Sequence, residues 1–258
     1  MIKVSATSDV GNRYTVNEDK VGWDKGRGLY FVADGMGGHT GGGVASGIVA
    51  KELLGPSSAC SLVEDIMRAH RAICAAAEAD PQLHSMGSTV VASKIQFDQC
   101  ELCWVGDSRA YLWREEQLQQ LTEDHSLVQA MLNRGEITPD QARHHQYKNV
   151  IMQSLGIDQP SPSRLVLELH PGDWLLLCSD GLTDELSDAE IADLLAVSHK
   201  ASEAEEALVA AALAKAGRDN ISVMILRYQQ YNWPAIWLYL LAGAALVGFL
   251  LQSSQGWV

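Results

Sequence analysis

The sequence has few prolines, few cysteines and a shortage of positive charge. With only seven prolines and 22 glycines in 258 residues, it is neither collagen-like nor low-complexity, and five cysteines exclude a disulfide-dense scaffold. The 19 basic residues against 32 acidic ones give a net charge of −13. Because such a field repels phosphate backbones, we expect no nucleic-acid-binding surface. The acidic excess is instead typical of a protein that holds cations.

The N-terminus lacks the apolar stretch of a secretion signal, since residues 1–9 read MIKVSATSD. We therefore expect this part of the chain in the cytoplasm, with its thiols reduced. Cys100 and Cys103 form a lone CxxC pair in a stretch that is typical of a strand. Because cysteines three apart on a strand point to opposite faces, we expect packing rather than a zinc or redox site.

Charged residues are missing from residues 228–258. Within this tail, residues 233–251 read WPAIWLYLLAGAALVGFLL, a helix length of about 28 Å against a bilayer core of about 30 Å. We interpret 233–251 as one transmembrane helix, with 229–232 as a short linker and 252–258 as a short tail. The alternatives are a buried helix that closes the domain and a helix that docks on a protein partner.

The basic residues around this segment predict its orientation. Arg218 and Arg227 precede it and no basic residue follows it, so the positive-inside rule places the large domain in the cytoplasm. The prediction is a single-pass protein of the cell inner membrane with its large domain in the cytoplasm.

Residues 1–228 alternate short strand-like and helix-like stretches without an internal repeat, and we expect one domain. Strands are predicted at 28–33, 88–92, 101–105, 110–113, 173–178 and 221–226. Helices are predicted at 44–54, 61–80 and 126–134. Further helix starts are predicted at Thr138-Pro139 and at two capping boxes, Ser187…Glu190 and Ser202…Glu205.

Six aspartates lie in short polar segments between these apolar stretches: Asp19, Asp34, Asp107, Asp180, Asp184 and Asp219. Four of them have a glycine or asparagine beside them, and an adjacent glycine lets a ligand approach closely. Each aspartate alone is typical of a turn or a cap. Six in one domain, without a His/Cys cluster, favour Mg²⁺ or Mn²⁺ over zinc.

Seven motifs follow one another along the chain: 17–19 (NED), 33–39 (ADGMGGH), 87–89 (GST), 105–109 (VGDSR), 121–126 (LTEDHS), 179–184 (SDGLTD) and 217–220 (GRDN). In this order they resemble the bacterial metal-dependent protein phosphatases, the type 2C serine/threonine phosphatases. The resemblance covers essentially all of 1–228 and none of the tail. It implies an α+β fold, a four-layer αββα sandwich of two antiparallel β-sheets flanked by helices.

The resemblance implies a two-metal centre that carries the catalysis. Asp34 would bridge two Mn²⁺ or Mg²⁺ ions, with the Gly35 carbonyl beside it, and Asp180 and Asp219 would be further ligands. The expected reaction is hydrolysis of phosphoserine or phosphothreonine by a water that the two metals activate. No Ser or Cys nucleophile is expected.

Five more residues match supporting positions of the family. Asp19 would bind a metal directly or through water, with Glu18 and Asn220 supporting the site. Asp107 and Asp184 would form, with Asp180, a third and weaker metal site of bacterial members.

The expected substrate-binding residues match the family pattern less closely than the expected metal ligands do. The family places its phosphate-binding arginine five residues before the aspartate of the NED motif, where this chain has Tyr14. A one-residue bulge would bring Arg13 to the phosphate; otherwise Arg13 is a surface charge. His39 would contact substrate, donate a proton or only hold its loop. Lys148 lies in the variable flap that, by the resemblance, borders the substrate. It would either contact a phosphopeptide or be a solvated surface charge.

We therefore expect a membrane-anchored serine/threonine protein phosphatase that acts on phosphoproteins. A cognate serine/threonine kinase whose marks it removes is a reasonable partner. The alternative is a catalytically silent metal-binding scaffold of the same fold that recognises phosphoproteins, which only the displaced Arg13 motivates.

Overall fold

The computed structural model describes residues 1–37, 41–56 and 61–229. Its strands are β1 (Ile2–Asp9), β2 (Lys20–Asp24), β3 (Leu29–Ala33), β4 (Gly35–Met36), β5 (Gly87–Ser88), β6 (Val90–Gln96), β7 (Gln99–Val105), β8 (Arg109–Arg114), β9 (Gln117–Gln120), β10 (Ser163–Glu168), β11 (Trp174–Cys178) and β12 (Ile221–Tyr228). Its helices are α1 (Gly41–Leu54), α2 (Leu62–Ala79), α3 (Leu127–Asn133), α4 (Pro139–Arg143), α5 (Asp180–Thr183), α6 (Asp188–Val197) and α7 (Ala201–Lys215), with a 3₁₀ turn η1 (Pro81–Leu83).

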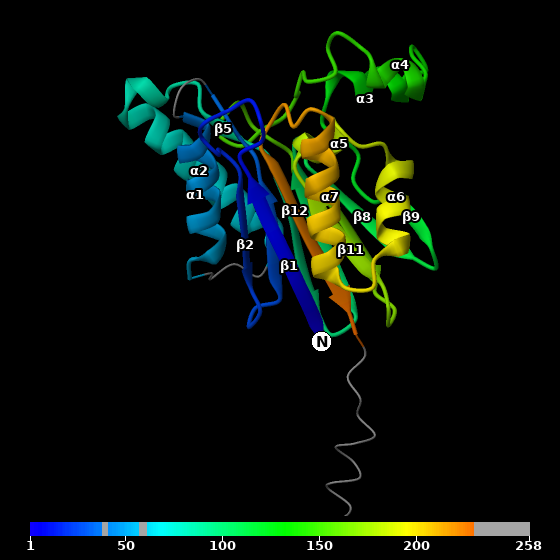
Figure 1. The fold of residues 1–258 in the computed structure, drawn as a ribbon. Helices are drawn as coiled ribbons and strands as arrows, with labels where there is room; N and C mark the ends of the chain where they lie inside the picture. Colours follow the sequence, from blue (N-terminus) through cyan, green and yellow to red (C-terminus); the bar gives the residue numbers. More distant parts are fainter. Residues whose placement is uncertain (38–40, 57–60, 230–258) are drawn as a thin grey trace, which may run out of the picture.

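Two five-stranded antiparallel sheets form the centre of the molecule (Figure 1). The first sheet has the order β1-β12-β11-β8-β9 and the second has the order β10-β7-β6-β3-β2. Strands β4 and β5 pair in a small separate ladder. In the first sheet the first and last described strands are neighbours, because β1 pairs with β12 along its whole length.

The molecule has four layers, a helical layer on each outer face of the two sheets, and three apolar clusters pack them together. Tyr30 and Leu102 of the second sheet and Met224 of the first belong to the cluster between the sheets. Helices α1 and α2 cover the outer face of the second sheet, and α6 and α7 cover the outer face of the first. Every residue of β3 and of β11 is buried, as expected for strands covered on both faces. The predicted α+β sandwich of two antiparallel sheets flanked by helices is confirmed.

Most of the predicted elements occur within a few residues of their predicted positions. Helix α1 begins three residues before the predicted start, at Gly41. Thr138 caps α4 with Pro139 in its first turn, as predicted, and also forms a capping box with Gln141 that was not predicted. The predicted capping box of Ser187 is present. The predicted box between Ser202 and Glu205 is wrong. Helix α7 already begins at Ala201, and the Glu205 carboxylate instead accepts a hydrogen bond of 2.8 Å from the Ser5 hydroxyl of β1.

The CxxC pair packs as predicted. Cys100 lies in the cluster between the sheets, and Cys103 lies in the cluster under α1 and α2, so the two thiols point to opposite faces of β7. Burial raises the pKa of each thiol to about 12. Both side chains are therefore neutral, inert parts of the core.

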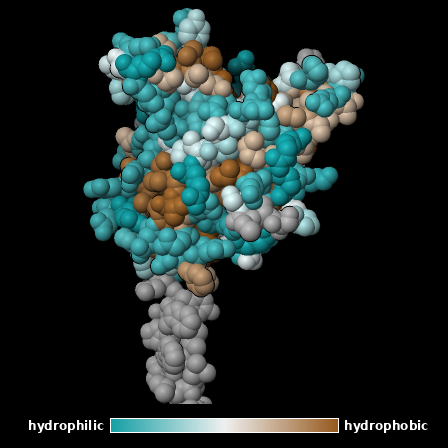
Figure 2. Space-filling view, turned by 180° about the vertical axis from the view of Figure 1, so that it is seen from behind, coloured by the Kyte–Doolittle hydropathy of each residue, from teal (hydrophilic) through white to brown (hydrophobic). Residues whose placement is uncertain are grey.

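The predicted transmembrane helix 233–251 lies outside the described residues, as do most of its linker and the last residues, 252–258. Within the described residues, no helix combines the length and the apolar character that a membrane span needs. The molecule seen from behind is mostly hydrophilic, with apolar residues gathered in a few patches (Figure 2).

Candidate active site

The six predicted aspartates lie at one end of the two sheets, where strands begin or stop. They are Asp19 before β2, Asp34 after β3, Asp107 between β7 and β8, Asp180 and Asp184 at α5 after β11, and Asp219 before β12. The register accounts for this, because Lys20 pairs with Ala33, and Cys178 pairs with both Arg109 and Val223. Antiparallel neighbours start and stop at the same edge, so segments far apart in the sequence meet there.

The carboxyl groups act on one another electrostatically. Burial, followed by the charges of Asp19, Asp180 and Asp107, raises the pKa of Asp34 well above its usual range. Burial and the charges of Asp107, Asp184, Asp219 and Asp19 do the same to the pKa of Asp180. The six side chains therefore form one cluster of mutually repelling carboxylates, which a bound cation would stabilise.

Two buried oxygens of this cluster have no donor. Asp19 is 2% exposed, and its Oδ2 accepts a hydrogen bond of 2.8 Å from the Ser179 hydroxyl. Its Oδ1 and the Oδ1 of Asp107 are buried without a hydrogen-bond partner among the described residues. Burial is the first cause that raises the pKa of Asp19 to about 6 and that of Asp107 to about 7. Buried acceptors of this kind are costly unless a donor or a cation satisfies them.

The donor set fits hard divalent cations, since it consists of carboxylate and backbone oxygens. Among residues 1–37, 41–56 and 61–229, no three His, Cys, Asp or Glu side chains already stand at the spacing of a single metal site. The argument that divalent cations fit this cluster therefore depends on the combined negative charge of the six aspartates and on the two buried oxygens for which the described residues supply no donor.

Glu18 and Asn220 hold the loop that carries Asp19. The Glu18 amide donates to Asn220 Oδ1 at 2.7 Å, and Glu18 Oε1 accepts from the Gly43 amide at 3.2 Å. Asn220 Nδ2 donates to the carbonyls of Val10 and Val16 at 2.9 and 3.2 Å. One asparagine thus ties three points of the segment before β2 to the start of β12.

Gly35 lies where only glycine fits. A Cβ at this position would lie 2.1 Å from the Gly42 carbonyl oxygen and 2.7 Å from that of Glu18. The chain after Asp34 therefore packs backbone to backbone against the start of α1 and the segment before Asp19.

The predicted substrate residues have different surroundings. The charge of Arg13 lowers the pKa of Asp219, although burial dominates and raises that pKa overall, so Arg13 lies close to the cluster. Arg13 also lies over the Tyr14 ring, 5.7 Å from its centroid. Lys148 Nζ lies 2.6 Å from Asp184 Oδ2. His39 is outside the described residues.

A cavity of about 600 Å³ adjoins the cluster. Asp107, Asp180 and Asp184 line one side of it, and residues of the segment from α3 to residue 149, here called the flap, line another. His144 and His145 of the flap are among the lining residues. The cavity is large enough for several side chains of a peptide.

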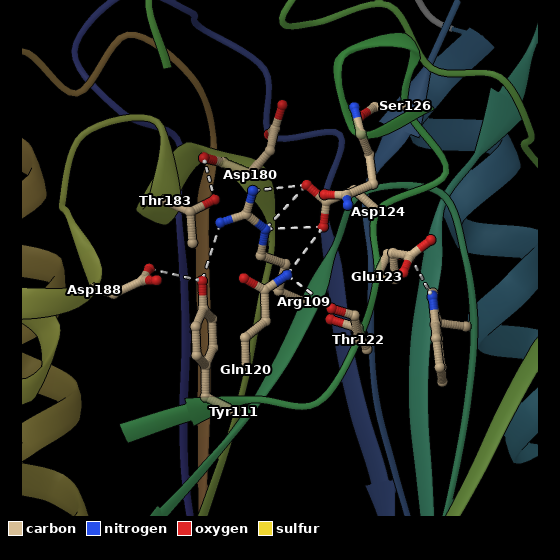
Figure 3. Close-up of polar contacts among 12 residues, drawn as sticks. Arg109, Tyr111, Gln120, Thr122, Glu123, Asp124, Ser126, Asp180, Thr183 and Asp188 are labelled. Atoms are coloured by element: carbon tan, nitrogen blue, oxygen red, sulfur yellow. Dashed lines mark hydrogen bonds and ion pairs between the residues drawn. The ribbon is translucent and has the colours of Figure 1, made fainter. Parts of the chain in front are cut away.

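A partly buried polar network that the sequence did not predict includes several of the residues that line this cavity, among them Arg109 and Asp124. Figure 3 shows its contacts. Arg109 forms three hydrogen bonds to Asp124, from Nε at 2.9 and 3.1 Å and from Nη2 at 2.6 Å, and a fourth from Nη1 to Tyr111 Oη at 3.1 Å. The Tyr111 hydroxyl donates to Asp188 of α6 at 3.2 Å. Arg109 and Asp124 both belong to recognised motifs, but only the fold shows that they are partners.

Comparison with known proteins identifies the family. Residues 12–216 match the family model described as protein phosphatase 2C. The chain belongs to the protein phosphatase 2C family, the metal-dependent serine/threonine protein phosphatases. It is 35% identical over 239 residues to the protein phosphatase PhpP of Streptococcus pneumoniae, covering 87% of this chain and 97% of that protein.

Two further comparisons concern serine/threonine protein phosphatases named PstP. This chain and PstP of Mycobacterium tuberculosis are 35% identical over 240 residues, which is 90% of this chain and 46% of that protein. This chain therefore spans about half the length of PstP. The crystal structure of the PstP catalytic domain with two manganese ions has a TM-score of 0.79 and 34% identity, covering 89% of this chain and 99% of that one.

Proposed function

We propose that this protein hydrolyses phosphoserine and phosphothreonine in phosphoproteins and that Mn²⁺ or Mg²⁺ is its cofactor. The observation that carries the proposal is the cluster of six aspartates, two of which have a buried oxygen that no donor in the described part of the chain satisfies. The PstP structure with two manganese ions supports the cofactor assignment.

Asp19, Asp34, Asp180, Asp219 and the Gly35 carbonyl would hold a pair of ions. Asp107 and Asp184, with Asp180, would hold a third. When bound, the ions would supply an activated water and neutralise charge on the phosphoryl oxygens. Glu18 and Asn220 would keep the Asp19 segment in place, as their hydrogen bonds indicate.

Arg13 and Lys148 would contact the substrate from two sides of the cluster. Arg13 is near Asp219, where a guanidinium would neutralise and orient a phosphoryl group. Lys148 and the flap histidines face the cavity beside Asp184, where the peptide around the phosphate would lie. His39 stays a candidate phosphate contact on sequence grounds.

We further propose that residues 1–228 form the catalytic domain and that 233–251 anchor it in the cell inner membrane, with the domain in the cytoplasm. The direction of β12 supports this arrangement, because the strand starts beside the aspartate cluster and ends at Tyr228, at the opposite end of the first sheet (Figure 1). The active site would then face away from the bilayer, towards phosphoproteins and a cognate serine/threonine kinase.

The test compares the full chain with a 1–228 truncation on a phosphothreonine peptide, with Mn²⁺ and with EDTA. Phosphate release should require metal and should vanish in Asp34→Asn. Asp98→Asn is the matched control, since Asp98 lies in the β6–β7 turn away from the cluster. No release from folded, Mn²⁺-loaded protein would favour the silent phosphoprotein-binding scaffold. Sedimentation of the full chain, but not of 1–228, with lipid vesicles tests the anchor.

A further inference from the structure

A second pocket, of about 200 Å³, lies at the end of the first sheet opposite the aspartate cluster. Its lining comes from the start of β1, the end of β12 and the first residues of α7. The polar side chains among the lining residues are Lys3, Ser5, Lys200, Ser202 and Arg227. Three of the five are cationic in a chain whose net charge is −13.

The two strands bring like charges together in this pocket. Lys3 of β1 is the direct cross-strand partner of Arg227 of β12. Like charges opposite each other destabilise a sheet unless something between them offsets the repulsion. In the part of the chain that the structure describes, no hydrogen bond or ion pair engages the Lys3 ammonium.

Arg227 is only partly satisfied. Its Nη1 donates to the His199 carbonyl at 2.8 Å, and its guanidinium lies over the Trp174 ring, 5.4 Å from the centroid. Its Nε is buried and has no hydrogen-bond partner among residues 1–37, 41–56 and 61–229. A buried N–H of a charged group without an acceptor is costly, and it indicates that a ligand oxygen belongs there.

Helix α7 begins at the same place. Its N-cap is Lys200, whose side chain makes no capping hydrogen bond, and among the described residues no side chain accepts from the first amides of this 15-residue helix. The unpaired amides and the helix dipole favour an anion at this end. The neighbouring carboxylates are already engaged, Glu203 with Lys200 at 3.0 Å and Glu205 with the Ser5 hydroxyl at 2.8 Å.

We propose that this pocket binds the phosphate of an anionic lipid head group. The inference rests on the membrane anchor proposed above. The amino group of Met1 donates to the Gln229 carbonyl at 2.7 Å, so the last described residue lies beside the strand that carries Lys3. Trp233, the first residue of the apolar segment, follows within at most about 14 Å of chain. A pocket within this distance of a span would be within reach of the head-group phosphates of a bilayer surface.

A bound head group would orient the catalytic domain on the membrane. The six residue steps of β12 from Ile221 to Arg227 separate these two residues by about 20 Å. With Arg227 at the lipid surface, the aspartate cluster beside Ile221 would face away from it. A lone flexible anchor would not set this orientation.

The test uses the full chain in neutral-detergent micelles with EDTA, and measures acetylation of individual lysines by mass spectrometry. Saturating short-chain phosphatidylglycerol should slow labelling of Lys3 and Lys200 about tenfold, as expected at roughly 90% occupancy. Phosphatidylcholine and inorganic phosphate at the same concentration should not. Lys25 is the internal control, because it lies in the β2–β3 turn at the same end of the molecule but outside the pocket.

A variant separates binding from folding. Ser202→Asp places a carboxylate in the first turn of α7, which favours the helix but repels an anion from the pocket. It should keep or raise the melting temperature and lose the protection of Lys3. If Lys25 were protected as strongly as Lys3, or if Lys3 were not protected at all, the proposal that this pocket binds a head group would be wrong. If inorganic phosphate protected Lys3 as strongly as the lipid does, the ligand would be free phosphate and not a lipid.

The anchor is tested separately with phosphatidylcholine vesicles. A full chain that does not sediment with them contradicts the anchor, whereas the micelle labelling still decides whether the pocket takes an anionic head group.

Discussion

Lys148 Nζ and Asp184 Oδ2 are 2.6 Å apart, so the flap contacts the aspartate cluster through one ion pair. The lysine comes from the segment after α4, and the aspartate follows α5 at the end of β11. A carboxylate proposed as a ligand of the third metal is therefore shared with a cation of the flap. Metal binding at this position and the position of the flap are expected to be linked.

Lys148→Gln should increase the affinity for Mn²⁺ at the site that includes Asp184, because the carboxylate no longer has a competing ammonium. A partly exposed ion pair is worth about 0.2–1 kcal/mol, so we expect an increase of up to about fivefold. Electron paramagnetic resonance titration of free Mn²⁺ measures it. Arg134→Gln is the matched control, since it breaks an exposed flap ion pair with Glu136. An equal change in both variants would contradict the link.

Asn220→Ala should weaken both the fold and the metal centre. It removes three hydrogen bonds from a residue that is 6% exposed, and we expect a loss of about 2–4 kcal/mol in the free energy of unfolding. Metal affinity should fall about 10–100-fold, because Asp19 loses its support. Urea denaturation and isothermal titration measure the two effects. Asn12→Ala also removes two side-chain bonds to carbonyls, but at an exposed position, and should leave metal affinity unchanged.

Asp124→Leu should destabilise the protein more than the double change Arg109→Met with Asp124→Leu. The single change leaves the largely buried Arg109 guanidinium without its carboxylate, at a cost of about 3–5 kcal/mol. The double change removes both charges, so most of that cost should be recovered. Urea denaturation of the two single variants and the double variant gives the coupling free energy between Arg109 and Asp124. Additive effects would show that the pair in Figure 3 contributes no coupling.

The free energy of unfolding in EDTA should fall as the pH rises from about 4 to about 7. Asp19 and Asp107 have folded-state pKa values of about 6 and about 7, whereas an unfolded aspartate titrates near about 3.9. Between those values the native state holds more protons than the unfolded state, so raising the pH favours unfolding. Asp19 alone should account for about 2–3 kcal/mol of this fall in the free energy of unfolding. Urea midpoints across this range measure the slope, which Asp107→Asn should reduce. A flat profile would contradict the raised pKa values.

The sequence predicted some elements of the fold correctly and others wrongly, depending on how local the interactions are that form them. Apolar runs such as 28–33 and 173–178 became β3 and β11 because strands covered on both faces need uninterrupted apolar residues. Thr138 and Ser187 cap their helices because a capping box uses only residues within one turn. The Ser202 box was wrong because Glu205 has a competing partner on β1, 200 residues away in the sequence.

The chain by itself determined the chemical nature of the cluster, the acidic motifs in their order and the apolar segment 233–251, since these depend on residue types and short spacings. Only the tertiary structure decided that Arg109 pairs with Asp124, that Lys148 contacts Asp184 and that Lys3 faces Arg227. Each of these pairs joins residues at least 15 positions apart. Strand register and helix packing bring such partners together, and no local pattern in the sequence encodes either of them.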